Sequence, residues 1–242
     1  MKLKVYADRI SQPCRAILVF CKVNGIDFEE VEIDLSQKQN LSPEYKEINP
    51  MQQVPAIEVD ERFKLFESHS ILRFLACAFP GVADHWYPSE QFKRAQISSV
   101  LDWHHSNLRH GSGALVYYSR IAPLFGQPLN LKAAAEAEKV LSNSLAKIES
   151  FWLKGDGQFL LGSDEPSIAD LSLVCEAMQL ELLDEKVRER LLGQHVKVQK
   201  WIDNTRNATQ PYFDEIHGVL FQVKESLMKM PSDGGSDETK IN

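Results

Sequence analysis

The first eighty residues switch between a period of two and a helical period, which is typical of a small α/β unit. Apolar and charged positions alternate over residues 2–8 and predict a short strand. An apolar stripe with helical spacing follows, with Pro13 suited to the first turn of a helix and Gly25 to its C-cap. Residues 30–35 alternate again, which predicts a second strand with one face in water.

A short helix, a hairpin and a longer helix complete this unit. Ser42 and Pro43 suit the N-cap and first residue of a helix that Pro50 limits to about two turns. Extended runs at 54–59 and 63–66 predict a β-hairpin, and helical spacing then returns until a Pro-Gly pair stops it. The predicted order is βαβαββα. A parallel first pair of strands with an antiparallel hairpin is the architecture of a thioredoxin-like domain.

The rest of the chain shows almost no strand pattern, which predicts an all-helical second domain. The fold class is therefore an α/β thioredoxin-like N-terminal domain followed by an all-α C-terminal domain. We predict the thioredoxin-like domain at 1–80, a linker at 81–88, the helical domain at 89–230 and a disordered tail at 231–242. The predicted helices run approximately over 89–119, 131–154, 167–181, 184–192, 195–208 and 212–229.

Composition and charge narrow the classes of function. The chain has 242 residues, 43% of them hydrophobic and 25% charged, which is enough to bury an ordinary globular core. There are 27 Lys and Arg against 34 Asp and Glu, a net charge of −7, and no basic stretch long enough to follow a phosphate backbone. No apolar run reaches the roughly 20 residues of a membrane span, and the amino terminus has no apolar secretory core. We therefore predict a cytosolic protein that binds neither nucleic acid nor membrane.

Cysteines and histidines give little support to metal or hydrolase chemistry. The four cysteines are scattered without a CxxC pair, so we predict reduced thiols and no metal site. His104 and His105 lie near Asp102, but adjacent helical residues point about 100° apart and the glutamate-flanked spacing of a zinc helix is missing. Surface or inter-domain histidines are the favoured interpretation. A hydrolase built on Ser11 would lack the G-x-S-x-G elbow.

Ser167 and Asp170 give the strongest local signal in the helical half. A serine can accept a hydrogen bond from the start of a helix while an aspartate three residues later returns to the serine N–H, which forms a capping box. We interpret this pair as structural rather than catalytic.

Ser11 has two interpretations that position alone leaves open. It lies between the first strand and the first helix, where its side chain faces the amino end of the helix dipole. A plain N-cap is favoured by position, because a serine before a Pro-started helix is what capping predicts. A reactive hydroxyl at the same place is the alternative.

Two further segments favour the reactive hydroxyl. Val54-Pro55 opens the hairpin, and a cis bond there would turn the Val54 backbone outward to pair with an extended peptide. Glu67 and Ser68 begin the third helix, whose free N–H groups make a carboxylate site. These groups would meet at one end of the sheet, and together they fit a small, acidic thiol peptide.

The sequence resembles theta-class glutathione S-transferases, and most of all the plant members, from about Lys2 to Met230. The motifs that carry the resemblance are Ser11-Gln12-Pro13-Cys14-Arg15-Ala16, Asn49-Pro50 with Val54-Pro55-Ala56-Ile57, Leu65-Phe66-Glu67-Ser68, Trp86-Tyr87-Pro88 and Ser167-Ile168-Ala169-Asp170. Their order and spacing are specific. The resemblance implies a glutathione-binding N-terminal domain, a helical domain that forms much of the electrophile site, and a homodimer.

The resemblance also implies a role for individual residues. Ser11 would be the catalytic hydroxyl. Glutathione would be held by Asn40, Leu41 and Gln53 at its glycyl end, by Val54 with Pro55 at its cysteinyl backbone, and by Glu67 with Ser68 at its γ-glutamyl end. The electrophile site would include Trp103, Arg109 and Tyr117. Gln53 departs from the family, whose members commonly carry lysine there, and this departure bears on glutathione affinity.

The implied activity is transfer of glutathione to organic halides or activated alkenes, together with reduction of organic hydroperoxides. Glutathione would be a co-substrate, with no permanently bound cofactor. A non-catalytic ligand carrier and a protein-interaction module on the same fold remain alternatives. Cys14 could be a thiol-transferase nucleophile, but reactive-cysteine relatives place cysteine at the position of the serine, so we interpret Cys14 and Cys21 as inert packing.

Overall fold

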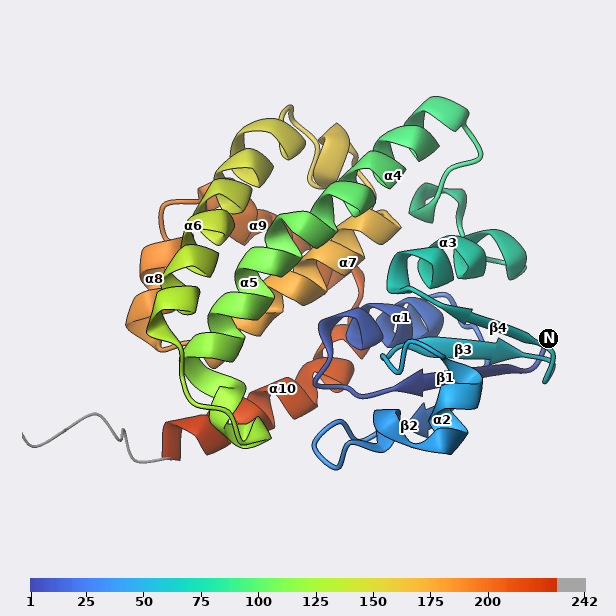
Figure 1. Cartoon of the computed structure of the whole chain (residues 1–242). Coiled ribbons are helices and arrows are strands. Elements are labelled where there is room, and N and C mark those ends of the chain that lie inside the picture. The colour runs from blue at the N-terminus through green and yellow to red at the C-terminus, as the bar shows by residue number, and fades with distance from the viewer. Residues whose placement is uncertain (230–242) are drawn as a thin grey trace, which may run out of the picture.

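The first part of the chain folds into a mixed sheet flanked by helices (Figure 1). The computed structural model describes residues 1–229, so the tail predicted at 231–242 lies outside the described residues. In chain order the elements are β1 (Leu3–Ala7), α1 (Gln12–Val23), β2 (Glu29–Glu32), α2 (Pro43–Ile48), β3 (Ala56–Val59), β4 (Phe63–Phe66) and α3 (Ser68–Ala78). The predicted order βαβαββα is confirmed.

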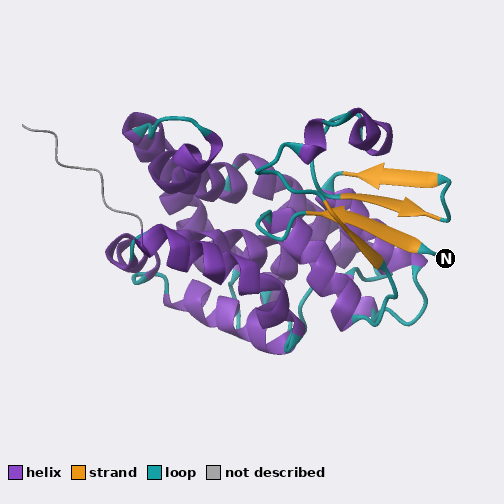
Figure 2. Ribbon diagram, turned by 90° about the horizontal axis from the view of Figure 1, so that it is seen from below, coloured by secondary structure: helices purple, strands orange, loops and turns teal. Residues whose placement is uncertain are grey.

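The sheet has the strand order β2-β1-β3-β4, with β1 parallel to β2 and antiparallel to β3. Alternation along β1 explains how it separates two cores. Leu3, Val5 and Ala7 are buried together with residues of α1 and α3. Tyr6 points to the other face, where its ring lies 6.1 Å from that of Tyr45 in α2. Figure 2 shows the sheet at one end of the molecule, with the helical part beside it.

The second part of the described chain consists of helices. They are α4 (Gln91–Ser106), α5 (Leu108–Val116), α6 (Leu131–Lys147), α7 (Ile168–Ala177), α8 (Glu185–Leu192), α9 (Val196–Ala208) and α10 (Tyr212–Lys229). Short 3₁₀ and π turns extend several of them, including residues 117–125, 148–152 and 178–182. The predicted helical character is confirmed, and within residues 1–229 no helix is long and apolar enough to cross a membrane.

The single helix predicted at 89–119 is wrong, because the helix breaks at Asn107. Its backbone leaves the helical region with φ −120° and ψ −92°. Its side-chain amide donates to the carbonyl of Trp103 at 2.8 Å, while its own N–H turns to the carbonyl of His104 at 3.3 Å. An asparagine side chain that takes a carbonyl of the preceding turn competes with the backbone ladder, and here it separates α4 from α5.

Helix α7 is the centre of the molecule. All its residues from Ile168 to Ala177 are buried, and it packs against α1, so it joins the two parts of the chain (Figure 1). The predicted capping box starts it: the Ser167 N–H donates to Asp170 Oδ2 at 2.8 Å, and Ser167 Oγ accepts from a backbone N–H at 3.2 Å. Asp170 Oδ1 also accepts from the Trp201 indole at 2.8 Å. Asp170 therefore fixes the start of α7 from within the core.

Candidate functional site

A cavity of about 890 Å³ lies where one end of the sheet meets the helices. It contains most of the predicted site residues: Ser11, Asn40, Gln53, Val54, Pro55, Glu67, Ser68, Arg109 and Tyr117. They come from loops and helix starts of the first part and from α5 and the turn after it in the second. The two halves of the chain thus supply facing walls of one cavity.

Ser11 is held in place by the turn that follows β1. The Asp8 carboxylate accepts the N–H of Ile10 at 3.0 Å and that of Leu35 at 3.1 Å, and the Asp8 carbonyl accepts the N–H of Ser11 at 3.0 Å. The bidentate pair of Arg9 with Glu30, at 2.8 and 2.7 Å, fixes the same turn from outside. The backbone that carries the Ser11 hydroxyl is therefore restrained on every side.

The Ser11 hydroxyl is not a helix cap. Ser11 has the extended backbone of an N-cap, with φ −77° and ψ 123°, yet its side chain accepts no hydrogen bond from α1. A capping oxygen bonds to the second or third N–H of a helix, and the second residue of α1 is Pro13, which has no N–H. The N-cap interpretation that position favoured is thus wrong for the side chain, which lines the cavity instead.

Cys14, three residues after Ser11, is fully buried. Burial raises the pKa of its thiol to about 12, although a hydrogen bond with the Ser11 side chain acts in the opposite direction. Burial also raises the pKa of Cys175 to about 12 and that of Cys21 further. All four cysteines are free in the structure, and only Cys77 is exposed.

The loop before β3 presents an unpaired stretch of backbone to the cavity. The carbonyl of Gln53 accepts from Tyr45 Oη and from Asn49 Nδ2, both at 2.7 Å, and Asn40 Nδ2 donates to the carbonyl of Gln52 at 2.8 Å. The Val54-Pro55 bond is cis. Neither the N–H nor the C=O of Val54 bonds to another group within residues 1–229. The buried amide of Asn49 therefore holds an edge that an extended peptide can pair with.

The start of α3 forms the adjoining wall. Glu67 stands before the helix with φ 69°, a left-handed conformation that costs a non-glycine residue about 1 kcal/mol or more. Its side chain does not cap α3, and Glu67 and Ser68 both line the cavity at the start of the helix, where the first N–H groups have no partner within the helix. The start of α3 therefore provides one carboxylate and several hydrogen-bond donors.

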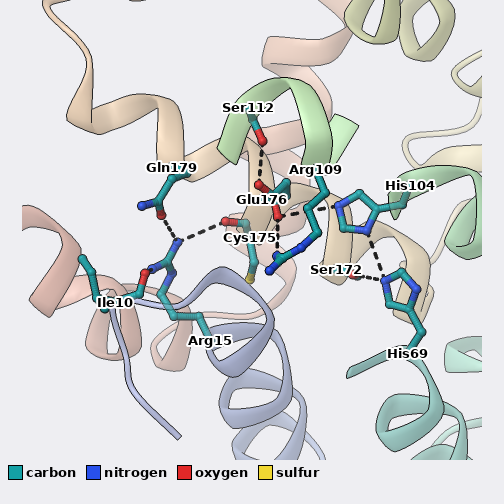
Figure 3. Close-up of polar contacts among 10 residues, drawn as sticks. All are labelled: Ile10, Arg15, His69, His104, Arg109, Ser112, Ser172, Cys175, Glu176 and Gln179. Atoms are coloured by element: carbon teal, nitrogen blue, oxygen red, sulfur yellow. Dashed lines mark hydrogen bonds and ion pairs between the residues drawn. The ribbon is translucent and has the colours of Figure 1, made fainter. Parts of the chain in front are cut away.

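The opposite wall comes from the helical part and combines a cation with apolar side chains. Arg109 Nη1 pairs with Glu176 Oε2 at 3.1 Å, and Ser112 Oγ donates to Glu176 Oε1 at 2.6 Å (Figure 3). Glu176 is fully buried, whereas 38% of the Arg109 side chain is exposed. Tyr117 lies beside Phe125, with ring centroids 6.2 Å apart, on the same wall.

Two predicted site residues lie outside the cavity. Leu41 is 55% exposed and does not line it, although its neighbour Asn40 does. Trp103 packs against Trp152 at a ring distance of 6.0 Å and is likewise absent from the lining. Trp152 belongs to the π turn that follows α6, so Trp103 packs toward that end of α6.

Other lining residues were missed by sequence reasoning. They include Gln12, His105, His110, Gly113, Leu124, Phe125, Gln179, Leu182 and Val223. Residues 105, 109, 113 and 117 all line the cavity, so a search for residues four positions apart on one helix face could have identified part of this wall. Gln179 and Leu182 give no local signal, since they enter the wall from the 3₁₀ turn after α7.

His69 and His104 form a buried contact between the two parts of the chain. His69 Nε2 lies 2.9 Å from Ser172 Oγ and 3.2 Å from His104 Nδ1. Burial lowers the pKa of His69 to about 3 and that of His104 well below its ordinary value, so both rings are neutral at pH 7. No cluster of potential metal ligands occurs in the part of the chain that the structure describes.

Comparison with known proteins places this geometry in a family. Residues 1–77 match the family model for the glutathione S-transferase N-terminal domain. Glutathione S-transferase T1 of Arabidopsis thaliana is 63% identical over 95% of this chain and 93% of its own length. Glutathione S-transferase T2 of the same plant is 62% identical, but the match spans only 39% of that longer protein.

Animal proteins of the theta class are also similar over their whole length. Bovine glutathione S-transferase theta-1 is 34% identical over 96% of this chain and 94% of its own. The crystal structure of human glutathione transferase theta-2, in complex with glutathione and an unknown ligand, superposes with a TM-score of 0.84 at 28% identity, covering 94% of this chain and 90% of that one. The chain therefore belongs to the theta class of the glutathione S-transferase family.

Proposed function

We propose that this protein joins the thiolate of glutathione to small electrophiles, and that Ser11 is the hydroxyl that acts on the sulfur. The observation that carries this proposal is the Ser11 side chain, which α1 does not use as a cap and which lines the cavity. The similar human theta-2 enzyme was crystallised with glutathione, which supports the same ligand here.

Glutathione fits the groups along the sheet side of the cavity. The unpaired Val54 backbone, next to Pro55, takes the cysteinyl N–H and C=O, which brings the sulfur toward Ser11. Glu67 attracts the α-amino group of the γ-glutamyl end, while the Ser68 hydroxyl and the start of α3 take its carboxylate. Asn40 and Gln53 lie where the glycyl end would reach.

The chemistry follows from one charge-assisted hydrogen bond. The Ser11 O–H donates to the sulfur and favours its ionised form, and such a bond contributes roughly 1.5 to 3 kcal/mol, or about one to two pKa units. A thiol with an ordinary pKa near 8.5 then ionises close to neutral pH. The thiolate attacks the electrophilic carbon, a carbon–sulfur bond forms, and a halide leaves or an activated alkene takes up a proton.

Hydroperoxide reduction uses the same thiolate. The sulfur attacks the outer oxygen of an organic hydroperoxide, and the oxygen–oxygen bond breaks to give an alcohol and glutathione sulfenic acid. A second glutathione then releases water and forms the disulfide, so the peroxide is reduced at the expense of two thiols. The apolar side chains beside Tyr117 suit the organic part of such a substrate, and the half-exposed Arg109 suits the oxygen that gains negative charge.

The decisive experiment measures the ultraviolet absorbance of enzyme-bound glutathione thiolate against pH, together with turnover of a hydroperoxide, an alkyl halide and a chloroaromatic. We expect a bound thiol pKa about one to two units below that of free glutathione, with turnover of at least one of these substrates. Absence of the thiolate signal at saturating glutathione would instead favour a ligand carrier or an interaction module.

We propose a homodimer in the cytosol, in line with family membership, and a domain boundary within the linker at 81–88, which lies between α3 and α4. Light scattering of the purified chain tests the dimer. A mass of twice 27.5 kDa is expected, and a mass of 27.5 kDa would contradict it.

A further inference from the structure

We propose that Arg15 is a positioning residue that holds the Ser11 hydroxyl in the geometry required to act on the glutathione sulfur. This inference rests on the proposed function, because it assigns to Arg15 a role that acts through Ser11. Arg15 lies in the first turn of α1, is fully buried, and reaches the helical part of the molecule (Figure 3).

The Arg15 guanidinium ties the turn before Ser11 from one side. Its Nη1 donates to the carbonyl of Ile10 at 2.7 Å and to that of Arg9 at 3.0 Å. The backbone N–H of Arg15 donates to the carbonyl of Ser11 at 3.1 Å. Three consecutive carbonyls that lead into the hydroxyl are thus bound by one residue, and the two directly before Ser11 depend on the guanidinium.

The other side of the guanidinium is fixed to the helical part. Nη2 donates to Gln179 Oε1 at 2.9 Å and to the Cys175 carbonyl at 3.2 Å. Gln179 lines the cavity on the electrophile side. Arg15 is therefore the direct hydrogen-bonded connection between the turn that carries Ser11 and the opposite wall, across 160 residues of sequence.

A buried cation at this place needs a specific reason, because removing an arginine from water costs several kcal/mol unless its charge and donors are satisfied. Burial lowers the pKa of Arg15, and nearby negative groups, Glu176 among them, act against that shift. Glu176 also binds Arg109 on the cavity wall. A guanidinium carries its donors on separated nitrogens in fixed directions, here Nη1 and Nη2, whereas an ammonium carries all its donors on one atom, so the arrangement selects arginine.

The test is Arg15→Lys, which keeps the positive charge and loses the fork. We expect the pKa of bound glutathione thiol, read from thiolate absorbance, to rise by about one unit, and kcat with a fast electrophile near neutral pH to fall about tenfold. Glutathione KM should stay within about twofold, because Val54, Glu67 and Ser68 are untouched. A purely structural role would lower the unfolding midpoint and leave the thiol pKa where it is.

A second variant and a control variant complete the test of Arg15. Gln179→Leu removes one acceptor of the fork at nearly constant volume, and it should raise the bound thiol pKa by a smaller amount if Arg15→Lys does not fold. Arg190→Lys breaks a comparable bidentate pair with Glu138, at 2.6 and 2.9 Å on the surface, and should leave the thiol pKa unchanged.

The outcomes separate this inference from the proposed function. A raised thiol pKa in both Ser11→Ala and Arg15→Lys supports both. A raised pKa in Ser11→Ala with a wild-type value in folded Arg15→Lys, or in Gln179→Leu when the former does not fold, overturns the role of Arg15 alone. An unchanged pKa in Ser11→Ala overturns the proposed function itself.

Discussion

Ser11 and Pro13 show how a single residue type decides what a neighbouring hydroxyl can do. A serine before a helix normally satisfies an N–H of the first turn, but proline at the second position of α1 removes one of the two N–H groups within reach. Ser11 keeps the extended backbone conformation of an N-cap, and the residue lines the cavity. At this position the proline removes one capping partner, which leaves the hydroxyl available for the role that we propose.

Ser11→Ala should lower turnover by roughly ten- to a hundredfold and leave the fold intact, because the lost hydrogen bond to the thiolate contributes roughly 1.5 to 3 kcal/mol. Stability should hardly change, since the hydroxyl caps nothing. Steady-state kinetics measure the change in turnover, and a urea titration of the same preparation measures the change in stability. Wild-type kinetics with every electrophile in a folded variant would remove Ser11 from the mechanism.

Cys14→Ser should matter much less to the chemistry. The thiol is buried with its pKa raised to about 12, so almost no thiolate is present at neutral pH. We expect turnover within about threefold of wild type when corrected for any loss of folded protein. If this variant lost activity at full stability while Ser11→Ala kept it, a thiol-transferase mechanism would replace ours.

Gln53→Lys should strengthen glutathione binding several-fold. The exposed Gln53 side chain borders the cavity, and an ammonium there attracts the glycyl carboxylate by on the order of 1 kcal/mol, more at low salt. Because this end of the peptide is far from the sulfur, the saturated rate should stay nearly constant. The measurement is glutathione KM at low and high salt with saturating electrophile. A change confined to kcat would show that the peptide lies differently.

At the scale of the element, one glycine allows α5 and α6 to pack. A Cβ built on Gly111 would lie 2.5 Å from the backbone nitrogen of Leu141 in α6, closer than carbon and nitrogen can approach. Gly113, two residues later, has its nearest atom at 3.7 Å, on Glu176. The two glycines share one helix but differ in what faces them, which makes them a matched pair.

Gly111→Ala should destabilise the protein by about 1 to 3 kcal/mol, because the backbones of α5 and α6 must move apart. Gly113→Ala should be neutral or add up to about 1 kcal/mol, since alanine is the better helix former and its methyl group makes an ordinary contact. Urea unfolding midpoints of the two variants give the comparison. Equal midpoints would show that α6 can move away from position 111 without lowering the stability of the protein.

At the scale of the whole molecule, buried neutral histidines link stability to pH. His217 in α10 stacks on Phe213 at 4.0 Å, and its Nδ1 donates to the Phe213 carbonyl at 2.8 Å. Burial lowers the pKa of His217 to about 3, as it does for His69. The unfolded chain therefore binds protons below about pH 6.5 that these folded side chains do not take up.

The free energy of unfolding should consequently fall as the pH drops from 7 to 5.5, by about 1 kcal/mol for each such histidine. The loss continues until the pH approaches the folded pKa. His217→Gln should reduce this fall by about 1 kcal/mol, whatever its effect on stability at pH 7. Urea titrations of both proteins at the two pH values provide the test, and parallel pH profiles would refute the assignment.

Features that neighbouring residues encode could be predicted from the amino-acid sequence. The alternating residues at 2–8 form a strand whose two faces contact different cores. The Ser167-Asp170 capping box starts a helix because both partners lie within one turn. The order βαβαββα, the helical second half and the position of Ser11 between strand and helix all follow from such local patterns. Most of the site residues that the family resemblance implied also line the cavity.

The contacts between distant residues, and the hydroxyls that no helix uses as a cap, depend on packing in three dimensions. Helical spacing alone could not show that Asn107 takes a carbonyl from α4 and divides the helix, nor that Trp103 turns away from the cavity. Arg15 contacts Cys175 and Gln179 because α1 packs on α7, and no residue pattern near Arg15 in the chain predicts that contact. Periodicity reports which face of an element is buried, whereas the partner on that face is chosen by packing over the whole molecule.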